Sequence, residues 1–222
     1  MTSMKLDDFL SKSWNRYVRL TPDASIIHKL LEERGDRIIN DHVAYRTFNI
    51  KGMDRLSLGS IFEEWGYQKA PDDLEFTEKK LTASYWIHPN PDYPKIFISE
   101  LLIEKFPKHL QDWVLDFTSK TLKKLNPLSA KVFLEPSWDP VNLKDYQQFY
   151  EMSEYASWTA AFGIQVNHFT VFVNSLTTFP SLEKLNTFLQ ENGIQLNALG
   201  GVIKGTPSEL LEQSSTVAKK IP

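Results

Sequence analysis

The chain contains no cysteine. Disulfide bonds, thiolate metal sites and cysteine nucleophiles are therefore excluded, and any metal site must use nitrogen and oxygen ligands. Basic residues form no stripe and the formal net charge is −3, so we expect no nucleic-acid partner. The sequence also lacks the Gly-x-x-x-x-Gly-Lys-Ser/Thr spacing of a phosphate-binding loop and the Gly-x-Ser-x-Gly turn of many hydrolases.

Long hydrophobic runs are missing as well. No window approaches the roughly 18 apolar residues of a membrane-spanning helix, and the first residues form no hydrophobic signal region. We therefore expect a cytoplasmic protein with no membrane partner. The composition is that of an ordinary soluble protein, with 41% hydrophobic and 24% charged residues and ample aromatic side chains for a core.

Two short segments look like one strand–helix unit used twice. The sequence around His42 reads NDHVAYRTF, and the sequence around His168 reads NHFTVFVN. Each segment places a histidine at the start of a strand-like run, and an amphipathic helix follows. His42 precedes Gly66, which ends the first helix, by 24 residues, and His168 precedes Gly193 by 25. A Gln and an Ala recur after both glycines, which agrees with an internal repeat.

The remaining pattern predicts an α+β fold in which two β-α-β-β modules form a concave mixed sheet around a metal site. A strand over residues 95–103 is apolar on both faces and should be central. Other strands are predicted at 41–49 and 82–87, with a short one near 69–78, and helices are predicted at 5–20, 23–34, 107–125 and 142–162. We divide the chain into a helical hairpin (1–35), a first module (36–106), linking helices (107–163) and a second module (164–222).

The repeat also predicts a gap at the end of the second module. Glu100, in the last strand of the first module, lies 58 residues after His42, and the equivalent position of the second module would be 226, beyond Pro222. By this symmetry the second module lacks its last strand. Either the sequence is a shortened piece of the protein, or the second module is degenerate.

Strand alternation places the candidate site residues. His42 and Arg46 share one face of their strand, and His168 faces away from the apolar side of its strand, which should pack under helices. A core histidine bonded to backbone is the usual interpretation of a single such residue. Two histidines at equivalent positions of a repeat favour a shared metal site instead.

A catalytic metal site usually adds one carboxylate to two histidines. Glu100 is the best candidate within the chain, because an unpaired charge in an apolar strand is costly. An internal ion pair, for instance with Arg46, is an equal alternative. Arg46 lies about 13 Å from His42 along the strand, at ~3.3 Å per residue. Its guanidinium could clamp the far carboxylate of a dicarboxylic acid, or form a structural salt bridge.

Five strings carry a resemblance to a known family: DHVAYRTF at 41–48, FISEL at 97–101, NHFT at 167–170, IKG at 203–205 and LEQSST at 211–216. Together they resemble the 2-oxoadipate dioxygenase/decarboxylase family, also called hydroxyglutarate synthases. The resemblance covers nearly the whole chain from about residue 36. It implies two modules of the glyoxalase-like, vicinal-oxygen-chelate architecture. It also implies a non-haem Fe(II) enzyme that uses O2 to convert 2-oxoadipate into 2-hydroxyglutarate with loss of CO2.

The resemblance assigns roles to three residues. His42 and His168 match the two histidine ligands of Fe(II), for which another divalent metal is an alternative, and Arg46 matches the arginine that binds the substrate carboxylate. In the family the third ligand is a glutamate of the last strand of the second module, and no residue of this sequence matches it. The implied substrate is a small 2-oxo dicarboxylic acid, with O2 as co-substrate.

Other functions stay open on the same fold. One is a glyoxalase-type isomerase or a metal-dependent hydrolase, and another is a protein that binds a small acid without catalysis. Isomerases and hydrolases work with Ni(II) or Zn(II) and need no oxygen, so dependence on oxygen and on redox-active iron separates them from a dioxygenase. His28, His88 and His109 are expected to be structural or surface residues.

Overall fold

The computed structural model describes residues 4–125, 128–139 and 141–218. The chain divides into two compact units. Unit 1 comprises Met1–Tyr17 and Asp41–Thr170, and unit 2 comprises Val18–Asn40 and Val171–Pro222. The module boundaries inferred from the sequence stay predictions, and the two units are described separately.

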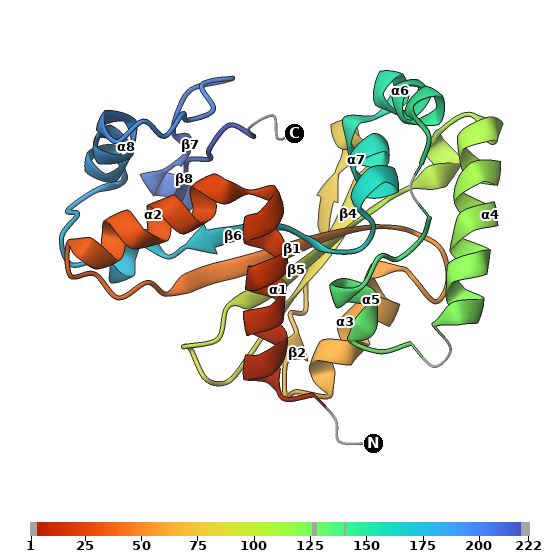
Figure 1. The fold of residues 1–222 in the computed structure, drawn as a ribbon, viewed down its shortest axis with the longest axis horizontal. Coiled ribbons are helices and arrows are strands. Elements are labelled where there is room, and N and C mark those ends of the chain that lie inside the picture. The colour runs from red at the N-terminus through yellow and green to blue at the C-terminus, as the bar shows by residue number, and fades with distance from the viewer. Residues whose placement is uncertain (1–3, 126–127, 140, 219–222) are drawn as a thin grey trace. The chain divides into compact units, whose positions relative to one another are not determined.

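The helices predicted over 5–20 and 23–34, the first strand and the long linking helix are confirmed as α1, α2, β1 and α4 (Figure 1). Along the chain the helices and strands are α1 (Leu6–Leu20), α2 (Pro22–Glu33), β1 (Asn40–Phe48), α3 (Arg55–Glu63), β2 (Gln68–Lys69), β3 (Leu74–Phe76), η1 (Thr77–Lys79), β4 (Leu81–Ile87), β5 (Lys95–Leu101), η2 (Ile103–Lys105), α4 (Lys108–Lys124), α5 (Lys131–Leu134), α6 (Leu143–Met152), α7 (Glu154–Phe162), β6 (Val166–Val171), η3 (Val173–Ser175), α8 (Leu182–Glu191), β7 (Lys204–Thr206), η4 (Pro207–Glu209) and β8 (Leu211–Gln213), where η marks a 3-10 helix.

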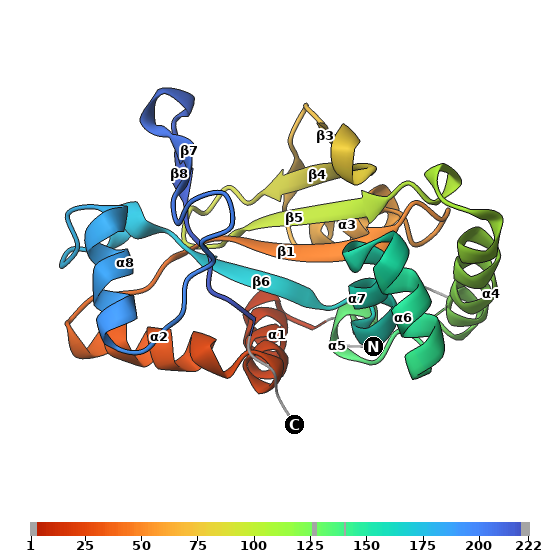
Figure 2. The same cartoon turned by 90° about the horizontal axis from the view of Figure 1, so that it is seen from above.

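A mixed sheet forms the centre of unit 1. Its strands lie in the order β2-β4-β5-β1-β6, with β3 paired to β4, and Figure 2 shows β4, β5, β1 and β6 side by side. β1 and β5 are parallel, whereas β4 and β5 are antiparallel. β5 lies between β1 and β4 and is buried along most of its length, which confirms the predicted central strand. The predicted α+β class and mixed sheet are also confirmed.

The pairing register sorts the side chains of the sheet onto two faces. Thr47 on β1 stands beside Glu100 on β5, and Arg46 stands beside Ser99. Residues that stand opposite each other on paired strands point to the same face of a sheet. Glu100 therefore lies on the face of Thr47, and His42 and Arg46 lie on the other face.

Helix α3 packs against the Glu100 face of the sheet. A Cβ atom on Gly59 would lie 1.8 Å from the ring of Trp86, so only glycine allows the helix to approach β4 this closely. The indole of Trp86 donates to Glu63 at 2.9 Å. The helix begins after Asp54, whose carboxylate accepts from two backbone amides of the first turn. Close packing and capping together fix α3 on the sheet.

The single helix predicted over 142–162 is wrong, because the structure has two helices, α6 and α7. Ser153 between them has an extended backbone, with φ −167° and ψ 116°, and its hydroxyl caps the first turn of α7. The break makes α7 a separate helix that contacts the sheet of unit 1. The Tyr155 hydroxyl accepts from the backbone amide of Thr47 at 3.0 Å and donates to the carbonyl of Ser99 at 2.7 Å. Figure 2 shows α7 near the C-terminal ends of β1 and β5.

Unit 2 contains α2, α8 and the exposed β7–β8 hairpin, and it has a small core of its own. The buried carboxylate of Asp36 fixes the chain before α8, since it accepts from the backbone amides of Thr177 at 2.6 Å and Thr178 at 3.1 Å. The core consists of apolar side chains from α2, α8 and the segments beside them: Leu31, Leu176, Phe179, Leu185, Leu189 and Ile194.

The β7–β8 hairpin repeats a feature of β3 and β4 in unit 1. In both places a short strand leads into one 3-10 turn, then into a non-glycine residue with φ 56°, and then into the next strand. That residue is Lys80 in unit 1 and Leu210 in unit 2. β2 pairs with the end of β4, and in the same relative place Leu196 forms a bridge to Thr216. These features agree with the internal repeat inferred from the sequence.

Candidate metal centre

The two histidines of the repeat meet in unit 1. His42 lies near the start of β1, and His168 lies in the neighbouring strand β6. Their Nε2 atoms are 3.2 Å apart, and the two ring planes are inclined by 81°. The structure therefore brings together the two residues that the sequence singled out as metal ligands.

A hydrogen bond from the other ring nitrogen orients each imidazole. Nδ1 of His42 lies 2.8 Å from the carboxylate of Asp41, and Nδ1 of His168 lies 2.9 Å from the amide oxygen of Asn167. Both oxygens only accept hydrogen bonds, so each Nδ1 carries the proton. The two nitrogens that approach each other, both Nε2, are then the ones without a proton. Metal-binding histidines are oriented in this way by acceptors for their second nitrogen.

The electrostatics of unit 1 favour a neutral ring at His168. Although part of this residue is exposed, neighbouring protein atoms displace water from the ring and lower its pKa to about 3, helped by repulsion from His42 and Arg46. The hydrogen bond from His42 lowers the pKa of Asp41 to about 2, against the opposing effect of burial and with further help from Lys95. Asp41 is thus a carboxylate at neutral pH, and His168 is in the form that binds metals.

The histidine pair fits two ligands of one metal ion. Two unprotonated nitrogens 3.2 Å apart repel unless a cation lies between them, and this spacing suits adjacent ligands with metal–nitrogen distances of about 2.1 Å. The Thr170 hydroxyl also lies close to this pair, 3.1 Å from Nε2 of His42. The absence of cysteine restricts further ligands from this chain to nitrogen and oxygen.

Glu100 does not join the histidines, so its prediction as the in-chain third ligand is wrong. Its carboxylate binds the Arg55 guanidinium, accepts from the Arg55 backbone amide at 2.8 Å and accepts from the Thr82 hydroxyl at 3.1 Å. The ion pair of Glu100 is therefore with Arg55, not with Arg46. The reason is the register of β1 and β5, which places Glu100 on the other face of the sheet. Within the described ranges no group of three or more His, Asp or Glu residues could hold a metal.

Arg46 lies on the histidine face of β1 and contacts α7. The central carbon of its guanidinium is 4.9 Å from the ring centre of Tyr155 and 5.0 Å from that of Trp158. Glu154 lies at the start of the same helix, with a carboxylate oxygen 3.6 Å from the guanidinium. The charge of Arg46 also contributes to the lowered pKa of His168. The charge of Arg46 therefore acts on the histidine pair.

Sequence reasoning missed the groups that orient these residues. Asp41 and Asn167 each precede a histidine of the repeat, and this shared position was an available signal. Lys95 donates to Asp41 at 3.0 Å, and Tyr155 supports Arg46. These two come from a different strand and from a distant helix, and their roles depend on tertiary packing that no local pattern reveals.

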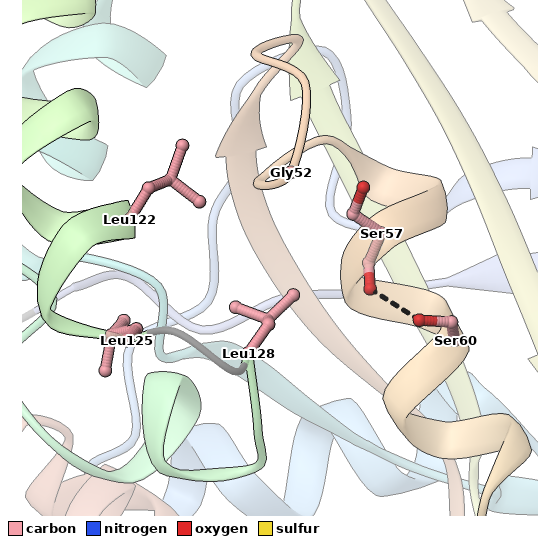
Figure 3. Close-up of a pocket in the computed structure, with 6 residues that line it drawn as sticks. All are labelled: Gly52, Ser57, Ser60, Leu122, Leu125 and Leu128. Carbon is pink, nitrogen blue, oxygen red and sulfur yellow. Dashed lines mark hydrogen bonds between the residues drawn. The ribbon is translucent and has the colours of Figure 1, made fainter.

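A cavity of about 400 Å³ lies elsewhere in unit 1 (Figure 3). Its polar groups are two serines of α3. The Ser57 hydroxyl donates to Asp54 at 2.7 Å, and the Ser60 hydroxyl donates to the Ser57 carbonyl at 2.8 Å. Both hydroxyls are thus engaged within the helix, and the cavity offers no titratable group from the described residues that line it: Gly52, Ser57, Ser60, Leu122, Leu125 and Leu128.

Comparison with known proteins agrees with the resemblance stated above. A family model described as 2-oxoadipate dioxygenase/decarboxylase matches residues 10–222. A curated protein of Arabidopsis thaliana, named 2-oxoadipate dioxygenase/decarboxylase, chloroplastic, is 36% identical over 220 residues, which is 92% of this chain and 59% of that protein. The chain therefore spans 59% of the length of this relative.

Several solved structures have folds similar to the fold of this chain. A protein of Shewanella frigidimarina NCIMB 400, named as a hydrolase, is 39% identical, with a TM-score of 0.85 over 97% of this chain and 84% of that one. The hydroxyglutarate synthase of Oryza sativa in complex with 2-oxoadipate is 34% identical, with a TM-score of 0.85 over 95% of this chain and 72% of that one. A glyoxalase superfamily protein of Ralstonia eutropha JMP134 is 15% identical, with a TM-score of 0.74 over 94% and 72% of the chains, and shows the fold alone.

Proposed function

The chain belongs to the 2-oxoadipate dioxygenase/decarboxylase family, and on that premise we propose that it is a non-haem Fe(II)-dependent enzyme of this type. In the proposed reaction one 2-oxoadipate and one O2 give one 2-hydroxyglutarate and one CO2. The observation that carries the proposal is the approach of the His42 and His168 Nε2 atoms to 3.2 Å. The named complex of the rice enzyme with 2-oxoadipate supports the choice of substrate.

His42 and His168 are the proposed protein ligands of the iron from this chain. When bound, the ion would supply Lewis-acid and oxygen-activating chemistry. Asp41 and Asn167 hold the protons on Nδ1 and leave both Nε2 atoms unprotonated, and a metal would take the place of the Thr170 hydroxyl at His42. The protein thus sets the direction of both ligands before a metal arrives.

Arg46 is the proposed binding group for the far carboxylate of the substrate. It projects from the histidine face of β1, four residues after His42, and its guanidinium can donate two parallel hydrogen bonds to a carboxylate. Fixing the far end of a flexible acid orients its 2-oxo end toward the histidines and reduces the entropy lost in the reaction.

A metal-dependent hydrolase is the second candidate, favoured by the name of the Shewanella relative. It would use the same two histidines to hold Zn(II) and would consume no oxygen. As for location, no helix of the described residues is long and apolar enough to span a membrane. We keep the cytoplasm as the proposed location, although the Arabidopsis relative is named as chloroplastic.

The test is coupled oxygen uptake. Protein purified without oxygen and reconstituted with Fe(II) is mixed with 2-oxoadipate, and O2, CO2 and 2-hydroxyglutarate are measured together. We expect equimolar amounts with the wild type and none above background with His42→Ala or His168→Ala. His109→Ala, which changes an exposed histidine of α4, is the matched control and should keep the activity.

Each other outcome has a definite meaning. Oxygen uptake without 2-hydroxyglutarate would move the proposal to a different 2-oxo acid. Metal binding without oxygen uptake would favour the hydrolase or another oxygen-independent enzyme. Activity that persists in both histidine variants would contradict the proposed site.

A further inference from the structure

The guanidinium of Arg46 is held in place by an aromatic clamp. Tyr155 and Trp158 of α7 form the clamp, and both ring centres lie within 5.0 Å of the guanidinium carbon. Tyr155 is itself fixed, because its hydroxyl bonds to the backbone of both Thr47 on β1 and Ser99 on β5. Burial raises the pKa of Tyr155, so this hydroxyl keeps its proton and stays a donor. The position of Arg46 is therefore set by α7 and the sheet before any ligand binds.

Arg46 nevertheless has one nitrogen whose N–H groups its surroundings do not satisfy. Its Nη1 atom is buried and has no hydrogen-bond partner among the described residues. The oxygen of Glu154 lies 3.6 Å from it, which is too long for a good hydrogen bond. A buried charged donor without a partner is unfavourable. The site is thus prepared for an acceptor that approaches more closely than Glu154 does.

Glu154 is poorly held in return. Its side chain is 70% exposed, whereas that of Arg46 is 21% exposed. Ion pairs with an exposed partner contribute little stability, and a glutamate at the surface can turn toward water with little loss. An incoming carboxylate can therefore replace Glu154 at Arg46 easily.

We propose that Glu154 is a replaceable counter-ion of Arg46, displaced by the far carboxylate of a bound dicarboxylic acid, so that α7 tunes the preference for acids with a second carboxylate. This inference rests on the proposed function, because it takes Arg46 as the carboxylate-binding group. Glu154 is a specificity residue in this account, and Tyr155 and Trp158 are positioning residues.

The competition has a measurable consequence. In the wild type a dicarboxylic acid must displace Glu154, and the displaced carboxylate still repels the bound one. Glu154→Gln removes both effects and should tighten binding of the dicarboxylic acid by about 2–5-fold, the range expected for one exposed charge pair. An acid without the far carboxylate has no group that displaces Glu154 from Arg46, and its affinity should not change.

The experiment compares two acids that differ only in that carboxylate. Calorimetric titrations without oxygen, with Fe(II) in all samples, measure binding of 2-oxoadipate and 2-oxohexanoate to the wild type, Glu154→Gln, Glu151→Gln and Arg46→Met. Glu151→Gln is the matched control, because it removes an exposed negative charge at the end of α6, three residues away. Only Glu154→Gln should tighten the binding of 2-oxoadipate, and it should leave the affinity for 2-oxohexanoate unchanged.

The outcomes separate this inference from the proposed function. A wild type that prefers 2-oxoadipate, loses the preference with Arg46→Met and is unchanged or weakened by Glu154→Gln would overturn the inference alone. Equal tightening of both acids, or the same effect from Glu151→Gln, would also overturn it, as a general charge effect. A wild type that binds both acids equally, or neither, would overturn the assignment of Arg46 and this inference together.

Discussion

At the scale of single residues, the histidine pair is asymmetric. Equivalent positions of the repeat hold Asp41 beside His42 and Asn167 beside His168. A carboxylate acceptor makes an imidazole a stronger metal ligand than a neutral amide does. Lys95 holds Asp41 in place through its second oxygen, at 3.0 Å. We therefore expect the affinity for metal to depend on Asp41 more than on Asn167.

Asp41→Asn tests this dependence. Loss of the negative acceptor should weaken divalent-metal binding by about 10–100-fold, the usual effect of changing a group that orients a ligand. Calorimetric titration with Co(II) measures the affinity. Asp112→Asn, which changes an exposed aspartate of α4, should bind as the wild type does. Equal affinities for Asp41→Asn and the wild type would refute the role of Asp41.

Glu100→Gln tests the assignment of Glu100 to the structural ion pair. Its side chain is only 4% exposed, and the change removes its charge from the Arg55 guanidinium, which keeps Asp73 as a partner at 2.8 Å. The free energy of unfolding should fall by about 1.5–3 kcal/mol, the usual contribution of a hydrogen bond to a charged group. Urea denaturation measures this loss, and Co(II) titration of the folded protein should give the wild-type affinity. A variant of normal stability that no longer binds metal would instead identify Glu100 as a ligand.

At the scale of secondary-structure elements, the alternation of side chains along the sequence predicted which residues of the same strand share a face. It placed His42 and Arg46 on one face and His168 away from the helix layer, and Phe169 indeed packs against Trp14 and Tyr17 of α1. It could not place Glu100, because that requires the register of β5 against β1. Register depends on pairing between distant segments, which local periodicity does not encode.

The helix boundary at Ser153 was missed for a related reason. The aromatic residues of 142–162 follow a helical pattern on both sides of Ser153, so periodicity alone predicted one helix. Serine is a good N-terminal cap, and its side chain can start a new helix inside such a pattern. The separate helix α7 that results carries the residues around Arg46, so the missed boundary also hid the aromatic clamp.

The fit of α3 against β4 can be tested at Gly59. Gly59→Ala would place a methyl group into the Trp86 ring, and the helix must shift. We expect a loss of about 1–3 kcal/mol in the free energy of unfolding, typical of overpacking. Ser60→Ala at the exposed neighbouring position should change stability by no more than about 0.5 kcal/mol. Unchanged stability of Gly59→Ala in urea denaturation would contradict the close packing.

At the scale of the whole molecule, the chain has two hydrophobic cores. All six tryptophans lie in unit 1, so their fluorescence reports that unit alone. In unit 2 burial disfavours the charge of Asp36, but hydrogen bonds from Thr178 and Thr177 outweigh it and lower the pKa of this carboxyl. The stabilising effect of the Asp36 carboxylate is therefore complete above the ordinary pKa of ~3.9. It is lost as the pH falls through the lower pKa of the folded state.

Asp36→Asn should affect unit 2 selectively. Loss of the charged acceptor should reduce hydrogen-exchange protection of the α8 amides at pH 7 by about 1.5–3 kcal/mol. The difference from the wild type should shrink as the pH falls below ~4, where the carboxylate becomes protonated. The unfolding transition followed by tryptophan fluorescence should not move. An equal loss in both probes would show that the two cores unfold as one.

The central claim is that His42 and His168 together hold one divalent metal ion. The most direct measurement is the number of Fe(II) ions bound per chain under anaerobic conditions, for the wild type, His42→Ala, His168→Ala and the control His109→Ala. We predict one tightly bound ion in the wild type and in the control, and none in either of the other variants. Stoichiometric iron retained in both His42→Ala and His168→Ala would contradict the claim.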